Sequence, residues 1–142
     1  VKCEGDLEVD AHHTVEDVGI CLGQAIAQAV GDKAGITRFG SAYVPMDGAL
    51  ARAAVDFSGR PYLVFNATFD EEMIGAFPSA LAEEFFRSLA DHSRINLHVD
   101  LIRGSNAHHS VEAIFKAAAR AIRAAVAIDP SVKGIPSTKG VL

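Results

Sequence analysis

Residues 107–113 read A-H-H-S-V-E-A and residues 11–17 read A-H-H-T-V-E-D, so one short motif occurs twice, 96 residues apart. At this offset nine of twenty residues are identical over 11–30. Alanine richness does not explain the match, because four of the six histidines in the chain belong to the two copies. A repeat at a fixed offset indicates a duplicated structural unit.

Each copy of the motif lies at the expected start of a helix. Asp10 and Asn106 occupy equivalent places before the motifs, and both are favoured N-cap residues. Apolar residues then recur at helical spacing, which predicts a first helix ending near Gly31 and a second ending before Asp129-Pro130. A strand-like stretch precedes each cap. Residues 95–102 alternate clearly, and 7–9 form a shorter counterpart.

The region between the copies predicts further strands and one more helix. The predicted strands are Tyr43-Val44, Ala53 to Phe57 and Tyr62 to Phe65, and the predicted turns are Asp47-Gly48 and Ser58-Gly59. A helix is expected to open at Phe77-Pro78-Ser79. The pattern predicts an α+β fold of duplicated βα units. We expect residues 1–35 to be the C-terminal part of a first repeat, 36–128 a second repeat and 129–142 a tail, so that the chain begins inside its first repeat.

Composition limits the classes of function. The chain has 142 residues, of which 49% are hydrophobic and 22% charged, as in ordinary globular proteins. Its net charge of −5 argues against a nucleic-acid partner, although a few local cations can still hold one phosphate. No apolar run approaches the roughly 20 residues that span a bilayer, and no signal peptide is visible. We therefore expect a cytoplasmic protein. Cys3 and Cys21 lack a metal-binding pattern, and we expect Cys21 to be a buried, reduced thiol.

The spacing H-H-x-x-E suits metal binding. His12 and Glu16 are four residues apart, so they share one helix face and can hold one ion. His13 is rotated by roughly 100° and should face another ion. The two repeats then predict a two-metal site, built within a chain or between adjoining subunits. One ion would be held by His12, Glu16 and His109, and the other by His13, His108 and Glu112.

The position of the motifs also bears on the metal. The positive end of a helix dipole disfavours imidazolium, and neutral imidazole is the form that binds metals. Mixed nitrogen and oxygen ligands suit manganese, iron or zinc, and additional carboxylates favour manganese. Asp17 has no counterpart, because its equivalent is Ala113. We interpret Asp17 as a supporting or solvated acid.

Five segments together resemble the imidazoleglycerol-phosphate dehydratase family. They are D-A-H-H-T-V-E-D (10–17), R-F-G (38–40), S-G-R-P-Y (58–62), N-A-H-H-S-V-E-A (106–113) and I-P-S-T-K-G-V-L (135–142). The resemblance implies two four-stranded sheets, each with two helices on one face, in a ribosomal protein S5 domain 2-like fold. It also implies a large closed homo-oligomer, a 24-mer, with two Mn²⁺ ions per active site at subunit contacts. The implied reaction removes water from imidazole glycerol phosphate in histidine biosynthesis.

The resemblance also implies roles for individual residues. The metal sets match the cross-repeat pairing above, which makes His12, Glu16, His108 and Glu112 the catalytic candidates through metal binding. Glu84 stands where the family supplies a histidine and is a further candidate ligand. The phosphate would be bound by an arginine fork, hydroxyls and a point charge. These substrate-binding candidates are Arg38, Arg60, Ser137, Thr138 and Lys139, with Lys116 lining the rest of the substrate.

The residues alone leave three alternatives. A di-metal hydrolase could use the same ligands to activate water. A metal-assembled shell without turnover would need the histidines but not the basic residues. A catalytically dead fragment is the third.

Overall fold

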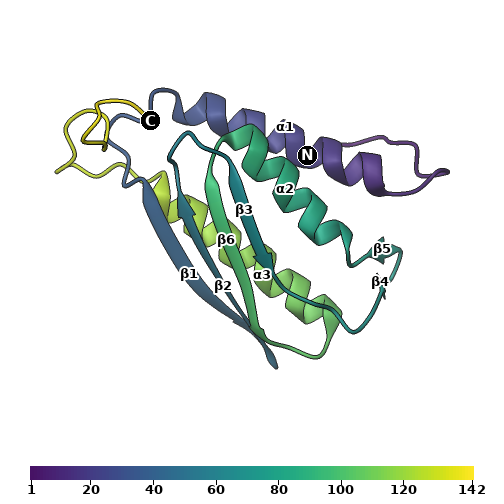
Figure 1. The fold of residues 1–142 in the computed structure, drawn as a ribbon. Coiled ribbons are helices and arrows are strands. Elements are labelled where there is room, and N and C mark those ends of the chain that lie inside the picture. Colours follow the sequence, from purple (N-terminus) through teal and green to yellow (C-terminus); the bar gives the residue numbers. More distant parts are fainter.

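The computed structural model describes all residues, 1–142, and contains one mixed sheet with helices on one of its faces (Figure 1). The sheet order is β1 (Phe39–Met46), β2 (Ala49–Asp56), β6 (Asn96–Arg103) and β3 (Tyr62–Asn66). β1 pairs antiparallel with β2, β2 antiparallel with β6, and β3 parallel with β6. This architecture confirms the α+β class.

Three helices complete the fold. α3 (Ala107–Ala125) packs across β1 and β2, α2 (Leu81–Ser93) lies against β3, and α1 (His12–Val30) packs along α2. The two short strands β4 (Met73–Ile74) and β5 (Phe77–Pro78) form a hairpin before α2. α2 therefore forms the crossover between the parallel strands β3 and β6, while α1 has no sheet of its own in this chain.

The core lies between the sheet and helices α2 and α3. Alternate residues of β2 and β6 point inward, as the alternating pattern predicted. Alanines line the inner face of α3 and let it approach the sheet closely. At the closest point the backbone of Ala121 leaves no room for a side chain on Gly40. Phe65, Phe86 and Phe115 join β3, α2 and α3 in an aromatic cluster, with ring centroids of Phe86 and Phe115 4.6 Å apart.

α1 contacts α2 through two glycines. Gly19 and Gly23 are the only fully buried residues of α1. A methyl group on Gly23 would lie 2.8 Å from His92 Cβ and 2.8 Å from Leu89 O. The face of α1 that points away from α2 includes Cys21, which is exposed. The prediction that Cys21 is buried was therefore wrong, although both cysteines are free.

The two helix starts differ. Asn106 caps α3 as predicted, because its side chain accepts a hydrogen bond from the backbone N–H of His109 at 2.9 Å. α1 begins at His12, and Asp10 Oδ1 accepts from the N–H of His12 at 2.7 Å. Asp10 was predicted to be the N-cap, but Ala11 occupies that position, so Asp10 lies one residue further from the helix. The strand predicted over residues 7–9 is wrong, because these residues form an exposed turn with no neighbouring strand to pair with.

The tail folds back over the end of the sheet without regular structure. Asp129 N donates to Gly35 O, and Gly35 N donates to Gly134 O, each at 2.8 Å. Ile128 forms an isolated bridge with Ile36. The tail is thus ordered by backbone hydrogen bonds at the C-terminal end of α3. No helix has the length and hydropathy needed to cross a membrane.

Candidate functional site

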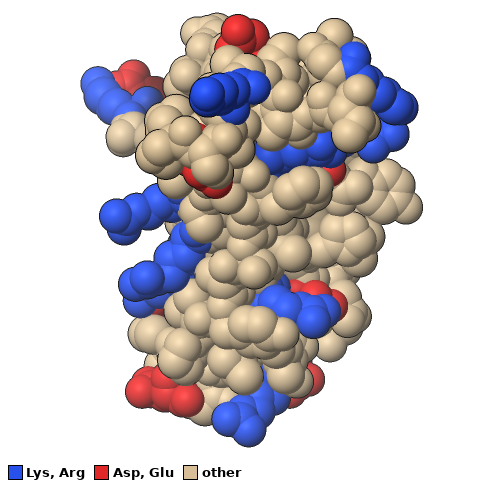
Figure 2. Space-filling model, turned by 90° about the vertical axis from the view of Figure 1, so that its left-hand side faces the viewer, with Lys and Arg blue, Asp and Glu red and all other residues tan.

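A basic pocket of about 640 Å³ lies where the tail meets the sheet. All five residues predicted to bind phosphate line it: Arg38, Arg60, Ser137, Thr138 and Lys139. Ser58 and Gly59 form its buried floor. Figure 2 views this side of the molecule and shows basic side chains over its upper part, where the tail folds back. Arg38 and Lys139, which are 101 positions apart in the sequence, are thus brought to one cavity.

Arg38 links the sheet and the tail at the pocket by hydrogen bonds. Its Nε donates to Asp56 Oδ1 at 2.7 Å and its Nη2 to Asp56 Oδ2 at 3.2 Å. Its Nη1 donates to Pro136 O at 2.8 Å, which holds the tail. The side chains of Arg38 and Asp56 are only 17% and 22% exposed. Part of the Arg38 guanidinium is therefore already committed to protein groups.

Arg60 and Lys139 provide the free cations. Neither forms an ion pair with a carboxylate, and both are exposed at the pocket. The Ser58 hydroxyl donates to Arg60 O and accepts from Arg60 N, which shapes the loop that presents Arg60. The N–H of Lys139 donates to Ser137 Oγ at 3.2 Å. Paired hydroxyls and unpaired cations are the usual ligands of a phosphate group.

Two further basic residues near the pocket were not identified from the sequence. Arg94 Nε donates to Gly59 O at 3.2 Å. Lys33 is half-buried beside the same glycine, and its burial, followed by the nearby charge of Arg94, lowers its pKa. No local motif marks either residue, because each reaches the pocket through folding.

The second histidine pair lies at the start of α3. His108 Nε2 is 3.1 Å from Glu112 Oε2, as the four-residue spacing predicted. Lys116 Nζ is 2.6 Å from the other oxygen of Glu112, and this contact, followed by that of His108, lowers the pKa of Glu112. His109 Nε2 points toward Asp47, at 3.4 Å. Lys116 therefore belongs to the histidine end of the molecule and does not line the phosphate pocket.

The first histidine pair lies at the start of α1. His13 Nδ1 is 2.8 Å from Asp6 Oδ2, and this hydrogen bond raises the pKa of His13. The Asp6 carboxylate therefore favours the protonated form of His13, whereas a helix start by itself disfavours imidazolium. His12 is exposed, Glu16 is half-buried, and Asp17 is exposed.

The two pairs do not meet within one chain. No group of three or more His, Cys, Asp or Glu side chains in the chain is placed to hold a metal ion. The predicted set of His12, Glu16 and His109 is therefore not formed inside a single copy, nor is the set containing His13 and His108. Glu84 lies half-buried in the first turn of α2 and joins no such group either.

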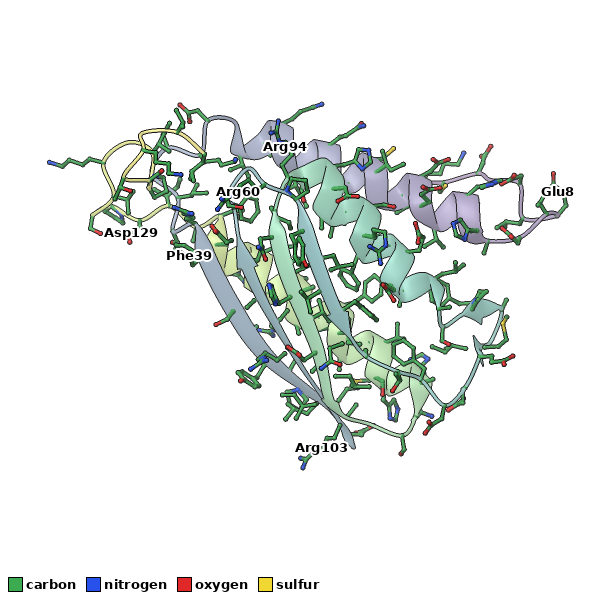
Figure 3. The ribbon with its side chains drawn as sticks, viewed as in Figure 1. Glu8, Phe39, Arg60, Arg94, Arg103 and Asp129 are labelled. Carbon is green, nitrogen blue, oxygen red and sulfur yellow. The ribbon has the colours of Figure 1, made fainter.

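The basic pocket and the histidines of α3 lie at opposite ends of that helix. Arg38 N donates to Ala125 O at the C-terminal end, whereas His108 and His109 lie in the first turn. A 19-residue helix is about 27 Å long. In Figure 3, Arg60 lies at one end of the sheet and Arg103, just before α3, at the other. One chain thus carries the basic pocket and the α3 histidine pair at well-separated places.

Comparison with known proteins identifies the family. The family model described as imidazoleglycerol-phosphate dehydratase matches residues 1–122. The chain is 57% identical over 142 residues to the imidazoleglycerol-phosphate dehydratase of Lacticaseibacillus casei, covering all of this chain and 73% of that protein. It is 58% identical over 143 residues to that of Polaromonas sp., covering 69% of that protein.

Solved structures support the same family. The imidazoleglycerol-phosphate dehydratase of Staphylococcus aureus superposes with a TM-score of 0.84 at 47% identity, covering 90% of this chain and 72% of that one. The enzyme from Pyrococcus furiosus, in complex with (S)-C348, gives 0.81 at 40% identity, covering 92% and 71%. The doubled histidine motif and these similarities agree with one another, and the chain belongs to the imidazoleglycerol-phosphate dehydratase family, a family of hydro-lyases in histidine biosynthesis.

Proposed function

We propose that this chain dehydrates imidazoleglycerol phosphate at sites shared between copies of the chain. In such a site the basic pocket of one copy faces histidine pairs of neighbouring copies in a closed homo-oligomer. The observation that carries this proposal is the separation of the two halves at opposite ends of α3. A single small substrate cannot contact both ends of a helix about 27 Å long.

Mn²⁺ is the metal that we propose for the histidine half. The donor chemistry fits, because each motif offers two imidazoles and a carboxylate, and His108 and Glu112 already lie 3.1 Å apart. The two ions would be held by His12, Glu16 and His109 and by His13, His108 and Glu112, drawn from adjoining copies. Glu84 remains a further candidate ligand. When bound, the metal supplies Lewis-acid stabilisation of negative charge on the substrate's imidazole.

The residues of the chain position the substrate around that chemistry. Arg60 and Lys139 neutralise the phosphate, while Ser137 and Thr138 donate hydroxyl hydrogen bonds. Fixing the phosphate at one end sets the place of the imidazole at the other, so the C3 hydroxyl and the C2 hydrogen that leave as water are held in one orientation. Lys116 fixes one oxygen of Glu112, which keeps the second oxygen available beside His108. In this arrangement Glu16 and Glu112 act as ligands rather than as free bases.

Mixed assemblies test whether sites are shared. Arg60→Gln disables the pocket and His108→Ala disables the histidine half, so each variant alone should be nearly inactive. When the two are dissociated, mixed equally and reassembled, up to about a quarter of shared sites would combine an intact pocket with intact histidines. Activity should return to a comparable fraction of the wild-type value. Mixing without dissociation is the control, and no recovery after exchange of subunits would contradict sharing.

Metal removal tests the ion separately. The chelated protein should lose activity and regain it with Mn²⁺, and calorimetric titration should give a lower metal stoichiometry for His12→Ala and for His108→Ala. Arg60→Gln is the matched variant, because it should keep the metal stoichiometry while losing activity. Full turnover in the chelated protein would rule out a metal role. Release of inorganic phosphate without the dehydrated product would favour the hydrolase alternative.

A further inference from the structure

Lys33 and Arg94 lie beside Gly59 of the basic pocket but outside the set of residues proposed to touch phosphate. We infer that Lys33 and Arg94 are positioning residues that hold the loop of residues 58–60 in the shape that presents Arg60 to the substrate phosphate. This inference rests on the proposed function of the pocket. It adds two residues from different elements, the turn after α1 and the end of α2.

Arg94 holds the loop directly. Its Nε donates to Gly59 O at 3.2 Å, which joins the C-cap of α2 to the floor of the pocket. The next residue continues the attachment, because Tyr62 N donates to Ile95 O at 3.0 Å. Figure 3 shows Arg94 and Arg60 at the same end of the sheet. The loop is therefore fastened on both sides of Arg60.

Lys33 supports the loop from the other side. A methyl group placed on Gly59 would lie 3.2 Å from Lys33 Nζ and 2.6 Å from the carbonyl carbon of Leu142. Gly59 is buried and has a φ of 73°, so this loop has little freedom to move without losing one of these contacts. Lys33 thus lies beside Gly59 and the end of the tail, both of which line the pocket.

The charges in this layer also favour an anion above it. The charges of Arg94 and Arg38 contribute, after burial, to the lowered pKa of Lys33. Asp56 is the one carboxylate that acts in the opposite direction, and its oxygens accept from Arg38. Around Lys33, the charges of two guanidinium groups are thus opposed by a single carboxylate. A phosphate bound at Arg60 and Lys139 would relieve this repulsion.

Both residues allow a substitution that leaves the backbone undisturbed. Lys33 has a φ of 65° and Arg94 a φ of 55°, in the left-handed region that asparagine tolerates best among residues other than glycine. Lys33→Asn and Arg94→Asn therefore remove the long basic side chain without adding backbone strain. Arg87→Gln is the control, because Arg87 is a basic residue of α2 whose only ion pair is with Glu83, away from the pocket.

The test measures steady-state kinetics and competitive inhibition by inorganic phosphate in the assembled enzyme. For Arg94→Asn and Lys33→Asn we expect KM and the phosphate inhibition constant each to rise roughly three- to tenfold, with kcat nearly unchanged. Circular dichroism and the melting temperature should stay close to those of Arg87→Gln. A fall in kcat with unchanged KM and phosphate inhibition would overturn the positioning role, as would kinetics equal to those of Arg87→Gln.

Arg60→Gln distinguishes failure of the positioning role from failure of the pocket. Because this variant is expected to be nearly inactive, phosphate binding is compared in all three variants by the rise in melting temperature that inorganic phosphate produces. If Arg60→Gln reduces this rise but Arg94→Asn and Lys33→Asn do not, the pocket stands and the positioning role fails. If Arg60→Gln leaves the rise unchanged, the proposed pocket itself is wrong. If all three reduce it, the inference is supported.

Discussion

Replacing Arg38 with glutamine should loosen the tail and destabilise the whole chain. Arg38 makes three charge-assisted hydrogen bonds, two to Asp56 and one to Pro136 O. Glutamine has the same Cβ, so the backbone at φ 73° is no more strained than before. The substitution thus isolates the guanidinium and leaves Asp56 without its partner.

The size of the effect follows from burial. Removing one partner of a buried ion pair costs about 3–5 kcal/mol. The side chains of Arg38 and Asp56 keep 17% and 22% exposure, so solvent screening should reduce the cost to below that range or its lower end, about 2–3 kcal/mol. For a chain of this length each kcal/mol corresponds to about 2–4 °C in melting temperature, which gives a fall of about 5–10 °C.

Two assays check this expectation. Thermal unfolding followed by circular dichroism gives the melting temperature, and limited trypsin digestion reports cleavage at Lys133 and Lys139 in the tail. In Arg38→Gln the melting temperature should fall and cleavage of the tail should become faster. In the double variant Arg38→Gln with Asp56→Asn, part of the loss should be recovered, because no unpaired carboxylate remains. A melting temperature within about 2 °C of wild type, with unchanged tail cleavage, would show that the Arg38 guanidinium does not hold the tail.

Three further predictions concern other parts of the fold. The hydrogen bond from Arg52 lowers the pKa of Asp100 below the ordinary value of 3.8. The ionised Asp100 carboxylate therefore stabilises the fold fully above pH 3.8, and this stabilisation is lost as the pH falls below that value. Because the Arg52 side chain is 47% exposed, solvent screening keeps the contribution small. The urea midpoint of Asp100→Asn should fall less steeply in acid than that of wild type, and parallel curves would count against this. Gly23→Ala should lower stability by about 1–2 kcal/mol, because crowding against α2 exceeds the gain in helix propensity; an unchanged or raised melting temperature would contradict the close contact. Gly59→Ala should reduce the stabilisation of the protein by inorganic phosphate in thermal shift assays, and an undiminished shift would show that the pocket floor tolerates a side chain.

The duplicated motif predicted more of the fold than any other feature. Both helices that follow it exist, and Asn106 caps the second, because caps and apolar spacing are local properties. The alternating residues 95–102 became β6 for the same reason. The strand predicted over residues 7–9 was wrong because a strand must pair with a neighbouring strand. Three residues carry no signal of whether such a neighbour is present.

In the candidate site, too, the sequence predicted local features better than contacts between distant segments. The phosphate pocket could be predicted as a set of residues only through family resemblance, and the fold then brought those residues together. Lys33 and Arg94 could not be found, because left-handed turns in unrelated segments carry them to Gly59. The cross-repeat metal sets remain a prediction, since helix geometry fixes which side chains share a face but not which copy they meet.

The length of α3 has a consequence for how this protein tolerates change. Inserting one residue in the middle of the helix would move its two ends apart by about 1.5 Å and rotate one against the other by about 100°. Every reactive side chain would still be present, yet the two ends of the helix would no longer keep their spacing and orientation relative to each other. Insertions and deletions in α3 should therefore be as damaging as the loss of a ligand.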